Sequence, residues 1–163
     1  MTINNDFIDT LKQWRRDLHK HPEFGFEEKR TSAFVASKLR EFGLNVTENI
    51  GGTGVVGTLK RGFSNRAIAL RADMDALRIN EQSDLAYKSV NTGVMHACGH
   101  DGHTTMLLGA AKLLSQSHKF DGTIQFIFQP AEEWGRGALA MLDDGLMERF
   151  PFEEIYGIHN MPG

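Results

Sequence analysis

The 163-residue sequence has one cysteine, four prolines and no long hydrophobic run. A single cysteine excludes an intramolecular disulfide framework, so Cys98 is a buried apolar residue, a nucleophile or a metal ligand. Because no stretch of about 18 apolar residues is present, we expect neither a membrane-spanning helix nor a membrane partner. The first residues lack a basic segment followed by an apolar one, and we therefore expect a cytoplasmic protein.

An excess of positive charge is also missing. The chain has 18 lysine and arginine residues against 21 aspartate and glutamate residues, which gives a formal net charge of −3. Nucleic acids are bound through clustered basic side chains, so a nucleic-acid partner is not expected. Hydrophobic residues make up 40% of the chain and charged residues 24%, a balance that indicates an ordinary globular domain. The length predicts one domain.

The spacing of apolar residues predicts alternating helices and strands in the later part of the chain. Helices are expected over residues 5–19, 27–42, 101–115 and 137–150. Asp101 is the expected N-cap of the third helix, and Leu139, Leu142 and Leu146 are expected on the apolar face of the fourth. Runs rich in β-branched residues predict strands at residues 44–48, 54–60, 67–72, 123–128 and 154–158.

This order of elements predicts the α/β class, because strands alternate with helices that can cross over a sheet. We expect a three-layer α/β/α sandwich with a mixed, largely parallel sheet. Residues 52–57 match the glycine spacing of dinucleotide-binding loops, but a β-type run follows them instead of a helix. A hairpin turn therefore explains these glycines better.

Polar side chains gather where the predicted elements meet. Those directly after strands are Asp73, Asp75, Glu132, Glu133 and His159, and those just before a helix are Cys98 and His100. In open α/β sheets the ligand crevice lies outside the carboxyl ends of the strands, so these groups are expected to share one pocket. His19 and His21 lie in no comparable cluster, and no role is assigned to them.

A divalent metal explains this mixture of groups best. Several carboxylates and a thiol around imidazoles would repel one another unless a cation lay among them. Thiolate, imidazole and carboxylate together suit zinc or a similar transition ion better than calcium or magnesium. Each group also has a plainer explanation: Cys98 as a core residue, His159 as a structural residue, Glu132 and Glu133 as an exposed helical turn, and Asp73 and Asp75 as turn or capping residues.

Five segments, residues 15–28, 71–77, 95–104, 128–133 and 157–163, resemble the amidohydrolase branch of the aminoacylase and carboxypeptidase-type metallopeptidases. That branch includes hippurate hydrolases, N-acyl-amino-acid amidohydrolases and auxin-conjugate hydrolases. The resemblance implies two divalent ions, which are zinc, manganese, nickel or cobalt. It assigns their ligation to Cys98, His100, Glu133 and His159. It also implies that Glu132 is the general base and that Asp73, Asp75 and Asp101 support the site without ligating.

The function that this resemblance implies is metal-dependent hydrolysis of N-acyl amino acids, which are small-molecule substrates. The alternatives are an exopeptidase or dipeptidase of the same family, a non-catalytic metal-binding fragment, and an amidase with Cys98 as nucleophile. Members of the family are longer, so residues 1–163 are expected to be the N-terminal portion of a catalytic domain, without the lid and dimerisation domain or the C-terminal part. We therefore expect an exposed sheet edge or apolar face, and association into a homo-oligomer stays open.

Overall fold

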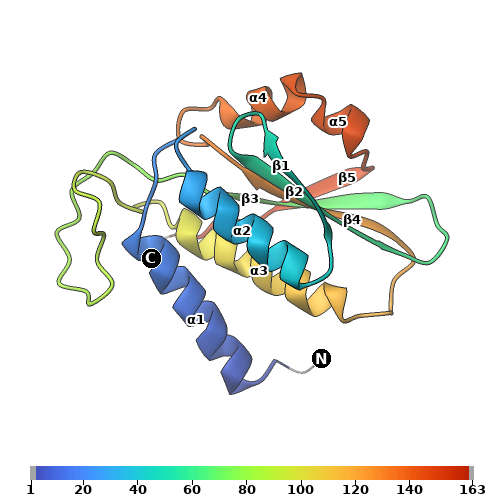
Figure 1. Ribbon diagram of the computed structural model, residues 1–163, viewed down its shortest axis with the longest axis horizontal. Coiled ribbons are helices and arrows are strands. Elements are labelled where there is room, and N and C mark those ends of the chain that lie inside the picture. Colours follow the sequence, from blue (N-terminus) through green and yellow to red (C-terminus); the bar gives the residue numbers. More distant parts are fainter. Residues whose placement is uncertain (1–2, 162–163) are drawn as a thin grey trace.

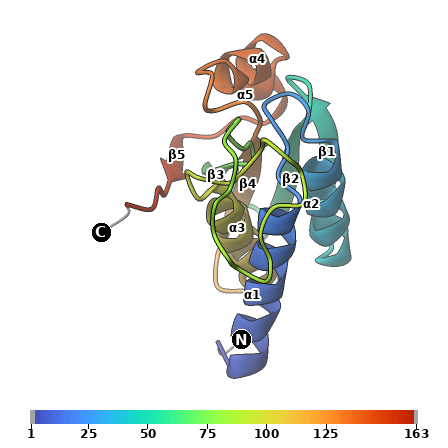
Figure 2. The ribbon, with the colours of Figure 1, turned by 90° about the vertical axis from the view of Figure 1, so that its left-hand side faces the viewer.

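The computed structural model describes residues 3–161 as a sheet covered by helices on both faces (Figures 1 and 2). In chain order the elements are α1 (Asn5–Lys20), α2 (Lys29–Glu41), β1 (Asn45–Ile50), β2 (Gly54–Arg61), β3 (Ala67–Asp73), α3 (His100–Ser115), β4 (Gly122–Gln129), α4 (Gly137–Asp143), α5 (Leu146–Arg149) and β5 (Glu154–Gly157). The α/β class and the three layers are as expected. Within residues 3–161, no helix has the length and apolar character needed to cross a bilayer.

The sheet has the strand order β1-β2-β4-β3-β5 among the described residues. The pairs β1–β2 and β2–β4 are antiparallel, whereas β4–β3 and β3–β5 are parallel. The sheet is thus mixed, as expected, although the two kinds of pairing are equal in number and it is not largely parallel. β1 and β2 form a hairpin, whose short connection requires antiparallel strands, and β2 also runs antiparallel to its other neighbour, β4. The polar groups follow the carboxyl ends of the three parallel strands, β3, β4 and β5.

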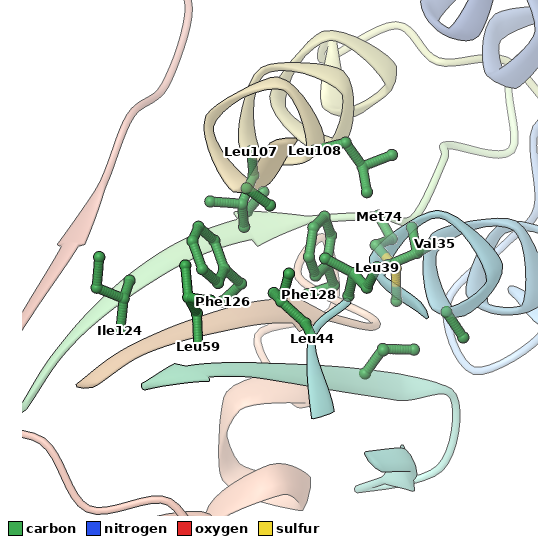
Figure 3. Close-up of a cluster of buried hydrophobic side chains, with 14 residues drawn as sticks. Val35, Leu39, Leu44, Leu59, Met74, Leu107, Leu108, Ile124, Phe126 and Phe128 are labelled. Carbon is green, nitrogen blue, oxygen red and sulfur yellow. The ribbon is translucent and has the colours of Figure 1, made fainter. Parts of the chain in front are cut away.

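Two apolar layers hold the helices against the sheet. The larger one lies between the sheet and helices α2 and α3, where Leu39, Leu108, Phe126 and Phe128 are fully buried (Figure 3). The smaller one lies on the opposite face, under α4 and α5, and contains Met141. The apolar area buried on both faces of the central strands holds the helices against the sheet. This packing fixes where the strands end relative to where the helices begin.

The β1–β2 turn confirms the hairpin expected for residues 52–57. Gly51 has a φ of 62° and Gly52 has a φ of 105°, a region that side chains rarely adopt. A Cβ on Gly51 would also lie 2.5 Å from the backbone nitrogen of Met141. The glycines therefore serve the turn and its contact with α4.

Helix α3 does not begin as expected. It starts at His100, and its N-cap is Gly99 in the left-handed conformation with a φ of 86°, so the predicted cap at Asp101 is wrong. Asp101 lies inside the first turn, and its carboxylate faces the side chains of His19 and Arg15. A glycine allows the chain to turn sharply into the helix without a side-chain cap.

The predicted helix over residues 137–150 is two short helices. Gly145 adopts a φ of 79°, which ends α4 and lets α5 start in a new direction. As a result, Met141 and Leu146 are buried, but Leu139 and Leu142 are exposed. The apolar face predicted from continuous helical spacing was therefore wrong at Leu139 and Leu142.

Strand β5 forms an exposed edge of the sheet (Figure 2), as the sequence led us to expect. All four of its residues are exposed, including Ile155 and Tyr156. A small apolar pocket lies between this strand and α3, with Met106 and Ile158 among its lining residues.

Candidate metal centre

The carboxyl ends of β3, β4 and β5 and the start of α3 bring the predicted polar groups together. The described residues form three overlapping sets of donor atoms, and within each set the atoms lie within 4.8 Å of one another. They are Cys98, His100 and His159; Asp73, His100 and His103; and His100, Glu132 and Glu133. His100 belongs to all three sets, because the first turn of α3 points into the space beyond the three strand ends.

Two buried donor atoms at the centre of the site have no hydrogen-bond partner among residues 3–161. They are Nε2 of His100 and Oε1 of Glu133, which lie 3.7 Å apart, and Nε2 also lies 3.7 Å from Oδ2 of Asp73. Burying an unpaired polar atom is costly, so such atoms are uncommon in folded proteins. Their mutual orientation fits a cation coordinated by both.

The sulfur of Cys98 lies beside this pair. Its Sγ atom is 3.4 Å from Nε2 of His159, an exposed residue that follows β5. Sulfur and two imidazole nitrogens therefore form one donor set, and this set shares His100 with the set that contains Glu132 and Glu133. This donor set fits zinc or another borderline transition ion, since purely oxygen-binding cations do not favour thiolate.

Asp75 fixes the orientation of two of these groups. Its Oδ1 accepts a hydrogen bond from Nδ1 of His100 at 3.1 Å, which leaves Nε2 facing the site. Its Oδ2 accepts from the backbone N–H of Glu133 at 3.0 Å. A carboxylate behind a histidine in this way is typical of metal sites, where it sets both the tautomer and the ring orientation.

Asp73 and His103, which form a donor set with His100, also hydrogen-bond to each other. Oδ1 of Asp73 accepts from Nδ1 of His103 at 2.6 Å, and Arg71 donates to Oδ2 at 2.8 Å. Nε2 of His103 accepts from the backbone N–H of Asn160 at 3.0 Å. The segment that carries His159 is thereby tied to α3. His103 was given no role from the sequence, although it lies three residues after His100 and so on the same helical face.

The adjacent glutamates differ in their surroundings. The side chain of Glu133 is 18% exposed and its Oε1 is buried, whereas that of Glu132 is 37% exposed and its Oε2 lies 3.8 Å from Nε2 of His100. Glu133 therefore faces the buried donors, and Glu132 lies at the border with solvent. The two side chains diverge because they follow each other along an irregular turn after β4.

The acidic surroundings change the ionisation of the thiol and the imidazole. Burial, together with the charge of Glu133, raises the pKa of Cys98 to about 11. Burial also opposes protonation of His100, but the hydrogen bond to Asp75 and the nearby carboxylates outweigh it and raise the pKa of the imidazole. Positive charge is therefore favoured at the centre of the site, and a cation beside Cys98 would favour its thiolate near neutral pH.

Asp101 is not brought to this site. Its Oδ2 accepts from Nδ1 of His19 at 2.8 Å and from Nε of Arg15 at 2.8 Å. His19 is buried and reaches Glu81 with its other nitrogen at 3.1 Å. His19 thus links α1, the long loop after β3 and the start of α3. Nothing in its local sequence indicated this, because its partners are 82 and 62 residues away.

Residues 69–163 match the family described as Peptidase family M20/M25/M40. The chain is 56% identical over 157 residues to a hippurate hydrolase of Campylobacter jejuni, a match that covers 96% of the chain and 41% of that protein. It is 46% identical to an IAA-amino acid hydrolase of Arabidopsis thaliana, with 95% of the chain and 35% of that protein covered.

Among solved structures, the chain resembles the YXEP protein of Bacillus subtilis, which is described as a dinuclear metal-binding peptidase. The TM-score is 0.92 at 41% identity, and the match covers 98% of this chain and 45% of that one. The chain therefore spans about two fifths of the length of the hippurate hydrolase and less than half of this structure.

Proposed function

The chain belongs to peptidase family M20/M25/M40, and from that membership we propose that it carries the metal centre of a hydrolase that cleaves the amide bond of N-acyl amino acids. The observation that carries the proposal is the pair of buried, unpartnered atoms, Nε2 of His100 and Oε1 of Glu133, which face each other beside Glu132. The names of the hippurate and IAA-amino acid hydrolases support an acyl group joined to an amino acid as the substrate.

In this proposal Cys98, His100, Glu133 and His159 hold two divalent ions, which are zinc, manganese, nickel or cobalt. Such ions polarise an amide carbonyl and lower the pKa of water towards neutrality. Cys98 would contribute its sulfur to this centre, because Sγ lies close to donor atoms of His100 on α3 and of His159 after β5. The description of the YXEP protein supports the number of ions.

Glu132 is the proposed general base. Its carboxylate lies at the solvent border of the site, where it can accept the proton of the attacking water and later donate it to the leaving amine. Glu133 faces the buried donor atoms, and its proposed role is to coordinate a metal ion. Asp75 supports this arrangement, since it holds both the ring of His100 and the backbone of Glu133.

The test is hydrolysis of benzoylglycine and acetylated amino acids by the metal-loaded protein. We expect Glu132→Gln to abolish turnover while metal content is unchanged, and Glu148→Gln, an exposed change on α5, to leave both unchanged. Loss of metal in Glu132→Gln equal to that in Glu133→Gln would show that the two glutamates do not divide the roles. No hydrolysis of any acyl amino acid by the metal-loaded protein would contradict the proposed reaction.

An amidase with Cys98 as nucleophile is less well supported. A nucleophilic cysteine needs a lowered thiol pKa, whereas burial and neighbouring carboxylates raise the pKa of Cys98 to about 11. A chelator should therefore stop hydrolysis, and re-adding zinc or manganese should restore it. Activity that survives chelation together with an acylated Cys98 would favour the nucleophile instead.

A further inference from the structure

A buried carboxylate outside the donor cluster contacts the turn that carries Glu132. Glu28 precedes α2 and is completely buried. Its Oε1 accepts from the backbone N–H of Ala131 at 2.8 Å, and its Oε2 accepts from the hydroxyl of Thr53 at 2.5 Å. Glu28 therefore joins the start of α2, the β1–β2 turn and the turn after β4.

Glu28 is not needed as the cap of its own helix. The first free N–H groups of α2, those of Arg30 and Thr31, donate to the carboxylate of Glu23 instead. The side chain of Glu28 makes no capping hydrogen bond. Burial removes the carboxylate of Glu28 from water, and hydrogen-bond donors of the protein must offset this loss. These donors are the backbone N–H of Ala131 and the hydroxyl of Thr53.

Ala131 has an unusual backbone conformation. Its φ is 44°, in the left-handed region that residues other than glycine rarely adopt. Such a conformation persists only where its surroundings hold it. Its N–H is held by Glu28, and its carbonyl oxygen accepts from the N–H of Gly137 at 3.1 Å. Two residues further on, Asp75 holds the N–H of Glu133, so the backbone is held on both sides of Glu132.

We propose that Glu28 is a positioning residue for Glu132, which it aligns by holding the left-handed backbone of Ala131. This inference rests on the proposed role of Glu132 as general base. Glu28 belongs to none of the three donor sets, and its effect passes through one backbone hydrogen bond. A small displacement of a catalytic group lowers the rate of the chemical step without weakening substrate binding to the same extent.

The experiment compares Glu28→Leu with Glu28→Gln in the metal-loaded protein. Glutamine keeps an oxygen that accepts from Ala131, whereas leucine has none. We expect Glu28→Leu to lower kcat on the order of 10²-fold with little change in KM or metal content, and Glu28→Gln to stay within a few-fold of the unchanged protein. Amide hydrogen exchange of Ala131 should become faster in Glu28→Leu only.

If Glu28→Leu does not fold, replacing Ala131 with its α-hydroxy acid removes the same N–H donor and leaves the buried carboxylate in place. The same fall in kcat is then expected. An unchanged kcat in either variant, or a Glu28→Gln variant as impaired as Glu28→Leu, overturns the positioning role. If the unchanged protein hydrolyses no acyl amino acid, the proposed function fails, and exchange at Ala131 still decides whether Glu28 holds the turn.

Discussion

Nδ1 of His100 lies 3.1 Å from Oδ1 of Asp75, and this contact orients the imidazole so that Nε2 faces the donor cluster. The second oxygen of the same carboxylate holds the backbone of Glu133. One aspartate, two residues after β3, therefore sets the positions of a residue on α3 and a residue after β4. The two meet only because β3 and β4 are parallel and adjacent.

Asp75→Asn should weaken metal binding by about 10–100-fold, because the amide no longer supports the basicity and orientation of His100. Competition with a fluorescent zinc chelator measures this affinity. Asp84→Asn, an exposed change in the loop after β3, is the matched control and should bind zinc like the unchanged protein. Equal affinities for all three proteins would contradict a supporting role for Asp75.

Cys98 in metal-free protein should react with iodoacetamide only at high pH. Burial and the charge of Glu133 raise the pKa of its thiol to about 11, so the thiolate is scarce near neutrality and increases as pH rises towards that value. The measurement is the alkylation rate against pH after chelation, with circular dichroism as the control for folding. A midpoint near that of free cysteine, about 8.5, would contradict the prediction.

His19 should make the stability of metal-free protein depend on pH. The hydrogen bond to Asp101, aided by Glu81 and opposed by burial, raises the pKa of His19 above 6.5. The pKa values of both carboxylates are lowered, so they stay charged near neutrality. The ion pairs are therefore fully formed at pH values below the pKa that histidine has in the unfolded chain. Their contribution to stability is lost as the pH rises through the pKa of His19 in the folded protein.

Urea unfolding between about pH 6 and pH 9 tests this pH dependence. The unchanged protein should lose free energy of unfolding over that range, and His19→Gln should lose much less. His118→Gln, at an exposed position, should follow the unchanged protein. Parallel curves for His19→Gln and the unchanged protein would show that the imidazole does not titrate as expected.

Two leucine substitutions test the packing of the helices. Leu108 of α3 is fully buried, so Leu108→Ala should lower the free energy of unfolding by about 2–5 kcal/mol. Leu142 of α4 is 47% exposed, and Leu142→Ala should change the free energy of unfolding by no more than about 0.5 kcal/mol. Chemical denaturation measures both. A large loss in Leu142→Ala would show that α4 buries the face that continuous helical spacing predicts.

Much of the candidate site was predictable, because strand ends are visible in the sequence. Asp73, Glu132 and Glu133 follow apolar runs, and parallel strands place such residues at one edge of a sheet. The cluster around Cys98 and His100 was also visible, since a thiol and an imidazole, both of which can ligate a metal, lie two residues apart. Local patterns were sufficient here because the carboxyl ends of parallel strands lie at the same edge of a sheet.

Residue types, strand ends and the α/β class thus follow from local order along the chain. The directions of individual side chains do not. Asp101 turns away to His19, Glu28 turns inward to Ala131, and Leu142 turns outward. Each direction depends on packing or on a partner that is remote in the sequence. Buried charges and donors must pair with such partners, and the partners come together only once the layers of the fold have assembled.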